Sequence, residues 1–166
     1  MAFVHLHNHT EYSLLDGHTH IYDMVKRAAD LDMPAVAISD HGVMSGVPQL
    51  CDKVEAETGK RVKPIYGCEV YFTTDEELRK DTKPKLYHLL LLAKTNEGYH
   101  NLVKLVSESH VDNFYYKPRT TFSMLQKYGK GIIGSSACIA GIIPKLLDNR
   151  QVDEAVEWAK KFASCF

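Results

Sequence analysis

Short apolar runs alternate with amphipathic stretches along most of this 166-residue chain. The runs have the length of buried strands, whereas the stretches between them repeat apolar residues every three or four positions, as helices do. Because parallel strands need helical crossovers that cover both faces of a sheet, this order predicts an α/β fold with a parallel sheet, either open or closed into a barrel. The predicted strands cover residues 3–6, 35–39, 63–72, 87–94 and 131–137, and the predicted helices cover residues 21–31, 47–57, 96–106, 120–130, 142–148 and 152–163, with Asn96 as an N-cap.

The composition, with 45% hydrophobic and 25% charged residues, is that of a globular protein that can bury a core. We expect a single domain over residues 1–166. A net charge of −1 excludes a general electrostatic attraction to nucleic acid, so any such contact must be local.

No segment of the sequence has the pattern of a signal peptide or a membrane span, since the longest apolar run covers only residues 89–93. We therefore expect a cytoplasmic protein without a membrane partner. The four cysteines form no CxxC pair, and reduced thiols would be free to pack or to bind metal.

Three histidines stand at alternate positions in the segment HLHNHTEYSLLDG, residues 5–17. Alternate residues of a strand face the same side, so His5, His7 and His9 are predicted to project together. In parallel α/β folds, functional sites gather at the carboxyl ends of strands. The further ionisable residues on or just after predicted strands are Asp40, His41, Glu69 and Cys138.

Some of these residues also have an interpretation without chemistry. Asp40 precedes a His-Gly turn and can serve as a turn former. His18 and His20 repeat the His-x-His spacing, but they fall at the start of a predicted helix, where polar residues are common, and we assign them to no site. Glu69 differs, because a carboxylate in an apolar strand is costly unless it is paired or coordinated.

Imidazole, carboxylate and thiolate groups together suit zinc, manganese or iron, and several of them in one pocket would hold more than one ion. A multinuclear site activates water and binds the attacking and leaving oxygens of a phosphoryl group, which makes phosphoester hydrolysis the natural reaction. The spacing alone leaves aminohydrolase chemistry open, because barrel amidohydrolases also begin with a His-x-His strand.

Six segments, in this order, closely resemble one known family, and together they run through nearly the whole chain. They are HLHNHTEYSLLDG, AVAISDHGVMSG, KPIYGCEVYF, HLLLLAKTNEGYHNLVKL, FYYKPRT and SSACIAGIIPKLL. The family is the polymerase and histidinol phosphatase (PHP) domain at the amino terminus of bacterial DNA polymerase III alpha subunits. The resemblance implies a distorted β/α (TIM-like) barrel with two or three divalent metal ions.

The same resemblance implies an activity for the domain. In many members it is a 3'–5' exonuclease, and in others the site has decayed to a structural role. The parent proteins are DNA-directed DNA polymerases of replication, so primer-end or single-stranded DNA and other polymerase holoenzyme subunits are the implied partners. The alternatives are a small-molecule phosphatase resembling histidinol-phosphate phosphatase and a metal-stabilised scaffold without catalysis.

Matching the family motifs position by position implies a set of metal ligands. His88 rests on the resemblance alone, because it starts a predicted strand and so lies at the wrong end for a parallel sheet. His5 and Asp40 are assigned to orienting the ligands. The implied ligands are His7, His9, Asp16, His41, Glu69, His88 and Cys138.

The sequence departs from the family at its end, because the final Asp-x-His metal motif has no match. We therefore expect a fragment whose barrel is truncated before the last strands, with low or absent activity. Exposed sheet edges would favour a homodimer.

Lys117 and Arg119 stand beside two tyrosines in the segment YYKPRTT, residues 115–121. Cations with aromatic rings can bind phosphates and stack bases, and Arg119 is the stronger candidate because a guanidinium binds two oxygens at once. The equally open alternative is a loop whose tyrosines pack and whose charges are solvated.

Overall fold

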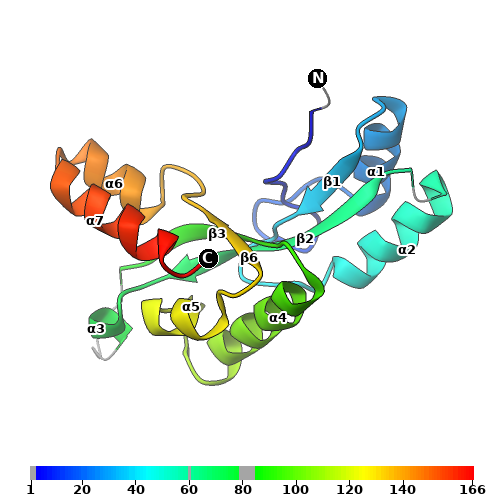
Figure 1. Ribbon diagram of the computed structural model, residues 1–166. Helices are drawn as coiled ribbons and strands as arrows, with labels where there is room; N and C mark the ends of the chain where they lie inside the picture. The colour runs from blue at the N-terminus through cyan, green and yellow to red at the C-terminus, as the bar shows by residue number, and fades with distance from the viewer. Residues whose placement is uncertain (1–2, 60, 79–84) are drawn as a thin grey trace. The chain divides into compact units, whose positions relative to one another are not determined.

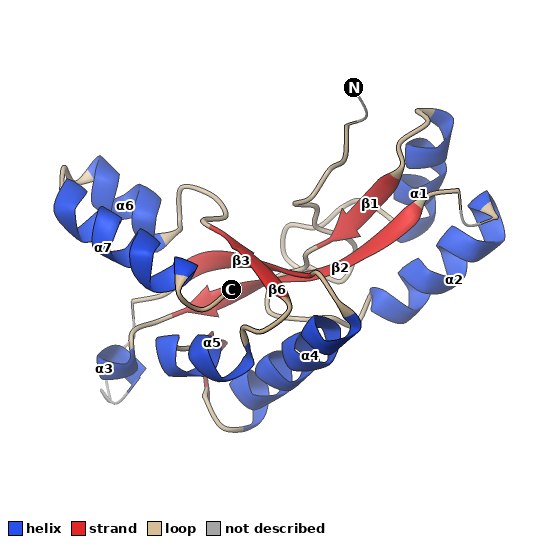
Figure 2. Ribbon diagram, in the orientation of Figure 1, coloured by secondary structure: helices blue, strands red, loops and turns tan. Residues whose placement is uncertain are grey.

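The computed structural model describes residues 3–59, 61–78 and 85–166. Helices and strands of mixed order make up the chain, which confirms the α/β class (Figures 1 and 2). The chain divides within strand β2 (Lys63–Phe72) into two compact units, Met1–Cys68 and Glu69–Phe166. The expectation of a single domain over residues 1–166 stays a prediction, and each unit is described by itself.

The first unit contains one parallel strand pair and two helices. Strand β1 (Ala35–Ile38) is buried along its whole length and pairs with β2 from Ala35↔Lys63 to Ile38↔Tyr66. Helix α1 (Ile21–Asp30) packs against helix α2 (Val47–Thr58). Ile21 and Val25 of α1 and Leu50 and Val54 of α2 are buried, as their three-and-four spacing predicts, whereas Cys51 of α2 is exposed.

The predicted strand at residues 3–6 is wrong, because these residues form no strand. The backbone still runs beside β1, where Ala37 N donates to His5 O at 3.2 Å and Ser39 N donates to Asn8 O at 2.9 Å. Side chains take the place of further ladder bonds: the Asn8 amide donates to Ala37 O, and Asn8 N donates to Ser39 Oγ. A hydrophobic pattern cannot show that polar side chains will interrupt the ladder in this way.

The second unit contains a sheet in the strand order β4-β5-β2-β3-β6. The second half of β2 pairs in parallel with β5, whereas β3 pairs antiparallel with β6 from Leu90↔Ser135 to Ala93↔Ile132. The predicted all-parallel sheet is therefore wrong, and the sheet is mixed. An apolar strand such as Leu89–Leu92 is buried whichever way it runs, so its pattern carries no information on direction. The remaining strands are β3 (Tyr87–Ala93), β4 (Phe114–Tyr115), β5 (Lys117–Thr120) and β6 (Ile132–Ser135).

Five helices accompany this sheet in the described part of the second unit, and three of them match the predicted bounds to within two residues. Helix α4 begins after Thr95, whose hydroxyl accepts from Gly98 N at 3.0 Å, so Thr95 and not Asn96 is the N-cap. The short helix α3 falls in a segment for which no helix is predicted from the sequence. The helices are α3 (Asp75–Leu78), α4 (Asn96–Val111), α5 (Phe122–Tyr128), α6 (Ile142–Asp148) and α7 (Val152–Ala163).

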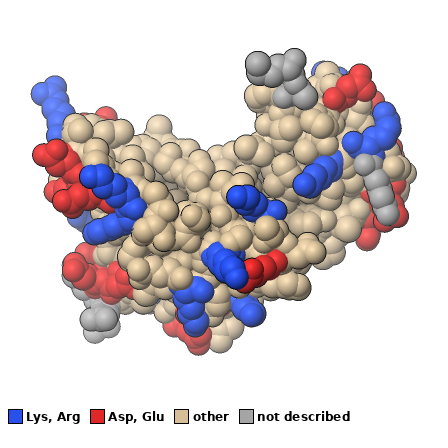
Figure 3. Space-filling model, in the orientation of Figure 1, with Lys and Arg blue, Asp and Glu red and all other residues tan. Residues whose placement is uncertain are grey.

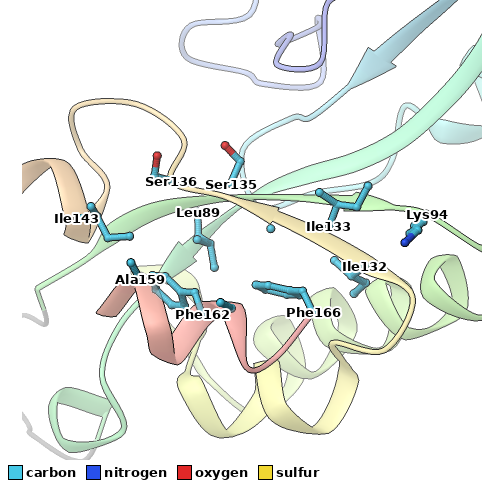
Figure 4. Close-up of a pocket in the computed structure, with 12 residues that line it drawn as sticks. Leu89, Lys94, Ile132, Ile133, Ser135, Ser136, Ile143, Ala159, Phe162 and Phe166 are labelled. Carbon is cyan, nitrogen blue, oxygen red and sulfur yellow. The ribbon is translucent and has the colours of Figure 1, made fainter. Parts of the chain in front are cut away.

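The core of the second unit lies between the sheet and helices α4 and α7. Leu91, Leu102 and Phe72 are fully buried, and the Phe162 ring meets Phe72 edge to face at 5.1 Å. Beside this core lies an apolar cavity of about 510 Å³. Its lining includes Leu89, Ile133, Phe162 and Phe166 (Figure 4). No helix of the described residues combines the length and apolar character that crossing a membrane requires.

Candidate metal centre

Three histidine rings of the first unit lie together. The His7 and His9 rings meet edge to face with their centroids 5.0 Å apart, and the His9 and His41 rings stack at 4.1 Å with an angle of 16°. His41 Nε2 also lies 2.8 Å from Asp16 Oδ2. The structure thus brings together four of the predicted ligands. His7 and His9 come from the segment that runs beside β1, Asp16 comes from the loop before α1, and His41 comes from the turn after β1.

A buried carboxylate ties these segments to one another. Asp40 is only 1% exposed and accepts from Thr10 N at 2.6 Å, from Thr10 Oγ1 at 2.8 Å and from Ser13 Oγ at 2.9 Å. Because Asp40 precedes His41, these bonds fix the turn after β1 against the loop that follows His9. This geometry supports the predicted orienting role of Asp40.

The turn that carries Asp16 depends on the glycine after it. A Cβ on Gly17 would lie 1.8 Å from Thr10 O, so a larger residue cannot fit without moving the backbone. Gly17 N donates to Ser13 O at 2.7 Å, which closes the turn. Steric constraints therefore require the glycine of the LLDG segment, in addition to any role of the carboxylate before it.

His5 lies in different surroundings from the other histidines of its segment. Its ring meets Phe3 edge to face at 4.7 Å. It also lines a cavity of about 330 Å³ together with Asn8 and with Asp23 and Arg27 of α1. The predicted common orientation thus fits His7 and His9, while the orienting role predicted for His5 stays a prediction without a contact to support it in the described residues.

The second unit brings together the other three predicted ligands. Glu69 of β2 is 1% exposed, and its Oε1 lies 3.1 Å from His88 Nδ1. Cys138 Sγ lies 3.6 Å from the same nitrogen and accepts from Ala140 N at 3.4 Å. The Tyr71 ring meets the His88 ring edge to face at 5.5 Å.

The mixed sheet explains the position of His88. Because β3 runs antiparallel to β6, the start of β3 lies beside the segment that follows β6. His88 N accordingly donates to Ala140 O at 3.1 Å, two residues beyond Cys138. His88 looked misplaced only because the sequence pattern predicted the wrong strand direction.

The spacing of these donor atoms fits divalent metal binding. Two donors of one tetrahedral ion, with bonds of roughly 2.1 Å, lie about 3.4 Å apart. The distances of 3.1 and 3.6 Å around His88 Nδ1 bracket this value, and the 2.8 Å between His41 and Asp16 is somewhat shorter. Imidazole, carboxylate and thiolate donors are also the types that zinc, manganese and iron accept.

Lys117 and Arg119 lie on β5, within a hairpin formed with β4. Arg119 is 9% exposed, its Nε donates to Asn113 O at 2.8 Å, and its guanidinium lies over the Tyr115 ring at 5.5 Å. Lys117 Nζ lies over the Tyr71 ring at 5.1 Å. Arg119 therefore contacts one of the two tyrosines beside it in the sequence, whereas Lys117 contacts Tyr71 of β2. Arg119 also holds the hairpin to the segment that follows α4.

Charged side chains elsewhere agree with the near-neutral composition. Figure 3 shows Lys and Arg scattered among Asp and Glu over the face in view. Some of these charges form ion pairs, such as Lys130 with Glu97 at 3.0 Å. The described charges therefore give no general positive field on the face in view.

Two residues of the network were missed by the sequence reasoning. Thr10 and Ser13 supply three of the hydrogen bonds around Asp40, yet neither is a metal ligand or a titratable group. The available signal was the presence of two hydroxyl residues in a turn, which commonly bond to nearby backbone and side chains. That signal could indicate a turn, but not that Asp40, 27 residues beyond Ser13, would be the partner.

The sequence of this chain is similar to that of one protein family over nearly its whole length. The family model described as PHP domain matches residues 5–166. DNA polymerase III subunit alpha of Aquifex aeolicus is 40% identical over 99% of this chain and 15% of that protein, and the Helicobacter pylori subunit is 44% identical over 84% of this chain and 11% of that protein. The chain thus spans less than a sixth of the length of these relatives.

Among solved structures the similarity is lower. An amidohydrolase from Chromobacterium violaceum has a TM-score of 0.45 and 18% identity, covering 65% of this chain and 33% of that one. At this TM-score the likeness adds nothing to the assignment.

Proposed function

This chain belongs to the PHP domain family and is homologous to part of the DNA polymerase III alpha subunits, and from this premise we propose that it is a metal-dependent phosphodiesterase domain acting on DNA 3' ends. The observation that supports the proposal most directly is the buried Glu69 carboxylate, whose Oε1 lies 3.1 Å from His88 Nδ1, with Cys138 Sγ 3.6 Å from the same nitrogen. We propose that the domain acts as part of a replicative DNA polymerase, since its relatives are alpha subunits of such polymerases and are much longer than this chain.

The proposed ligands divide between the units. In the first unit they are His7, His9, Asp16 and His41, and in the second they are Glu69, His88 and Cys138. With seven donors, we propose two or three bound ions, drawn from zinc, manganese and iron. Asp40 and His5 are proposed to orient ligands and not to bind the ions.

When bound, such ions polarise a phosphoryl oxygen and lower the pKa of water towards neutrality. The protein's own side chains then have defined tasks. The imidazoles act as neutral nitrogen donors, while Asp16 and Glu69 supply negative charge that offsets the ions. Glu69 is the strongest case, because a carboxylate that is only 1% exposed is costly to bury unless it is paired or coordinated.

We propose that Lys117 and Arg119 assist DNA binding from the β4–β5 hairpin. A guanidinium can bind two phosphate oxygens, and the neighbouring Tyr115, 39% exposed, can stack on a base. Arg119 already donates its Nε to Asn113 O, so the remaining guanidinium nitrogens would make the phosphate contact. Loss of affinity for single-stranded DNA in Arg119→Ala, measured across salt concentrations, tests this role.

A homodimer is the remaining proposal about partners. β4 and β6 are the end strands of the described sheet in the second unit, and edge strands present unpaired backbone groups to other chains. Light scattering at high protein concentration is expected to give a dimer mass. A monomer mass at every concentration removes this proposal.

The experiment that tests the proposed function combines elemental analysis with a 3'-labelled DNA cleavage assay. We compare the chain with a His7→Ala, His9→Ala double variant. The matched control is a His18→Ala, His20→Ala double variant, which has the same spacing and the same chemical change, but whose His20 side chain is 67% exposed and contacts only Glu11 in the described interactions.

The first double variant is expected to lose metal and to stop releasing nucleotides from the 3' end, while the control keeps both. Unchanged metal content in the His7, His9 variant contradicts the ligand assignment. Metal binding with release of phosphate from small phosphomonoesters, and none from DNA, supports the small-molecule alternative. Metal binding without any cleavage supports the scaffold.

A further inference from the structure

The hydroxyl group of Ser13 lies among three groups of the candidate metal centre. Ser13 Oγ donates to Asp40 Oδ1 at 2.9 Å and accepts from His41 N at 3.1 Å. It also lies 3.4 Å from His9 Nδ1. Ser13 is 3% exposed, so bulk water does not compete for these positions.

The number of protons on the Ser13 hydroxyl determines which atom is the donor in its contact with His9. A serine hydroxyl has one proton to donate and two lone pairs to accept with. Its proton goes to Asp40, whose two oxygens also accept from Thr10 N and Thr10 Oγ1. A backbone N–H can only donate, so His41 N occupies one lone pair. Only the second lone pair is left to face His9, and His9 Nδ1 must therefore be the donor.

We propose that Ser13 holds the His9 ring in the tautomer that is protonated at Nδ1. A neutral imidazole protonated at Nδ1 has its lone pair on Nε2, and this lone pair is what a metal ion binds. Ser13 is thus a positioning residue that selects Nε2 as the metal-binding atom of His9. The inference rests on the proposed function in one respect, which is that His9 is a metal ligand.

The surrounding contacts fix the ring as well as its proton. The His9 ring stacks on His41 at 4.1 Å, and the backbone of His41 is held by the same Ser13 hydroxyl. The carboxylate of Asp40, in turn, fixes the orientation of that hydroxyl by taking its proton. A chain of carboxylate, hydroxyl and imidazole therefore plays the part that a carboxylate bonded directly to histidine plays at many metal sites.

The direct test is to observe the His9 ring nitrogens by nitrogen-15 NMR in the metal-free full chain, at a pH where the ring is neutral. The nitrogen that carries the proton is identified from its chemical shift and its couplings to the ring protons. In the unmodified chain, His9 is expected to be protonated at Nδ1. Protonation at Nε2 overturns the proposal, and this result requires no variant to fold.

Variants then test whether Ser13 is the cause. In Ser13→Ala, His9 is expected to become a mixture of the two tautomers, and Ser13→Thr, which keeps a hydroxyl, is expected to restore the Nδ1 proton. The matched control is Ser39→Ala, which removes an equally buried hydroxyl that bonds Asn8 N and O on the same segment and contacts no histidine ring in the described interactions. An unchanged tautomer in Ser13→Ala overturns the proposal.

Metal affinity gives a second readout. Loss of a group that orients a metal-binding histidine typically weakens affinity 10- to 100-fold. We expect that loss for zinc in Ser13→Ala and a much smaller one in Ser39→Ala. Equal losses in the two variants contradict a specific role for Ser13. Because the tautomer is read without metal or DNA, a chain that fails to cleave DNA but shows the Nδ1 proton contradicts the proposed function alone.

Discussion

Cys138 lies in the segment that follows β6, with its sulfur 3.6 Å from His88 Nδ1. If its thiolate is a metal ligand, cobalt substitution should produce a sulfur-to-metal charge-transfer absorption in the near ultraviolet. Cys138→Ser is expected to lose this absorption, while Cys51→Ser, which changes an exposed cysteine of α2, keeps it. Cobalt-loaded protein without the absorption, or with one that survives in Cys138→Ser, excludes Cys138 as a ligand.

At the same scale, single residues differ in how well a sequence predicts their surroundings. His7, His9 and His41 follow from short motifs, and the structure brings their rings together. Ser13 does not, because its importance comes from Asp40, which is distant in sequence and meets it only after folding. A hydroxyl has no distinctive spacing, so its role becomes visible only when the donors and acceptors around it are known.

Helix α4 approaches the turn before β6 so closely that only glycine fits at the contact. A Cβ on Gly98 would lie 1.7 Å from Gly131 O, which is backbone and cannot rotate away. Replacing a helical glycine with alanine ordinarily stabilises by up to about 1 kcal/mol. Gly98→Ala is instead expected to destabilise by about 1–3 kcal/mol, as overpacking does.

Urea unfolding measures this effect. Ser107→Ala, an exposed position of the same helix, serves as the control and should change the free energy of unfolding by less than about 0.5 kcal/mol. A Gly98→Ala variant that is as stable as the unmodified chain, or more so, means that α4 and the turn before β6 can separate without cost.

Helices α4 and α5 are also linked by an ion pair that should respond to acid. Lys127 Nζ and Tyr128 OH both donate to Glu108 Oε2, at 2.8 and 2.7 Å, and these hydrogen bonds hold the pKa of Glu108 below its ordinary value. A lowered carboxyl pKa contributes stability above the ordinary value, and that contribution disappears as the pH falls through the folded value.

Glu108→Gln should therefore unfold more easily at pH 7, by about two- to fivefold in the unfolding equilibrium constant. The difference from the unmodified chain should shrink as the pH is lowered from 7 to below the ordinary glutamate pKa. Urea titrations across this range provide the measurement. Glu97→Gln, whose partner Lys130 is 79% exposed, is the control and should show a smaller effect. A difference that does not shrink as the pH falls shows that the charge of Glu108 is not its cause.

Helices and strands were predicted well where hydrophobic periodicity alone determines them. They were predicted poorly where strand direction or polar side-chain contacts determine the structure. The helices at residues 142–148 and 152–163 match α6 and α7, because their apolar spacing is regular. The strand at 3–6 fails because Asn8 and Ser39 side chains replace ladder bonds. The direction of β3 fails because a uniformly buried strand looks the same from either end, and this error is what made His88 look misplaced.

For the whole molecule, length and composition indicate a globular α/β protein, but they contain no sign that contacts divide the chain at Cys68. That division falls inside one continuous strand, where no change in hydrophobicity marks it. Each of the two units contains its own set of proposed ligands. Metal binding should therefore contribute to the stability of both units, and this contribution can be measured by removing the metal.

Chelation is expected to lower the melting temperature of the chain. A ligand that binds only the folded state at 100 times its dissociation constant adds about 2.7 kcal/mol, which for a chain of this size corresponds to about 5–10 °C. Differential scanning calorimetry before and after dialysis against a chelator measures the change, and because two units need not unfold together, each transition is followed separately. The His7→Ala, His9→Ala variant should lose the metal-dependent part of the transition that belongs to the first unit, because two of that unit's proposed donors are gone. If metal removal, verified by elemental analysis, leaves every transition where it was, the proposed ligands hold no ion that the folded chain depends on.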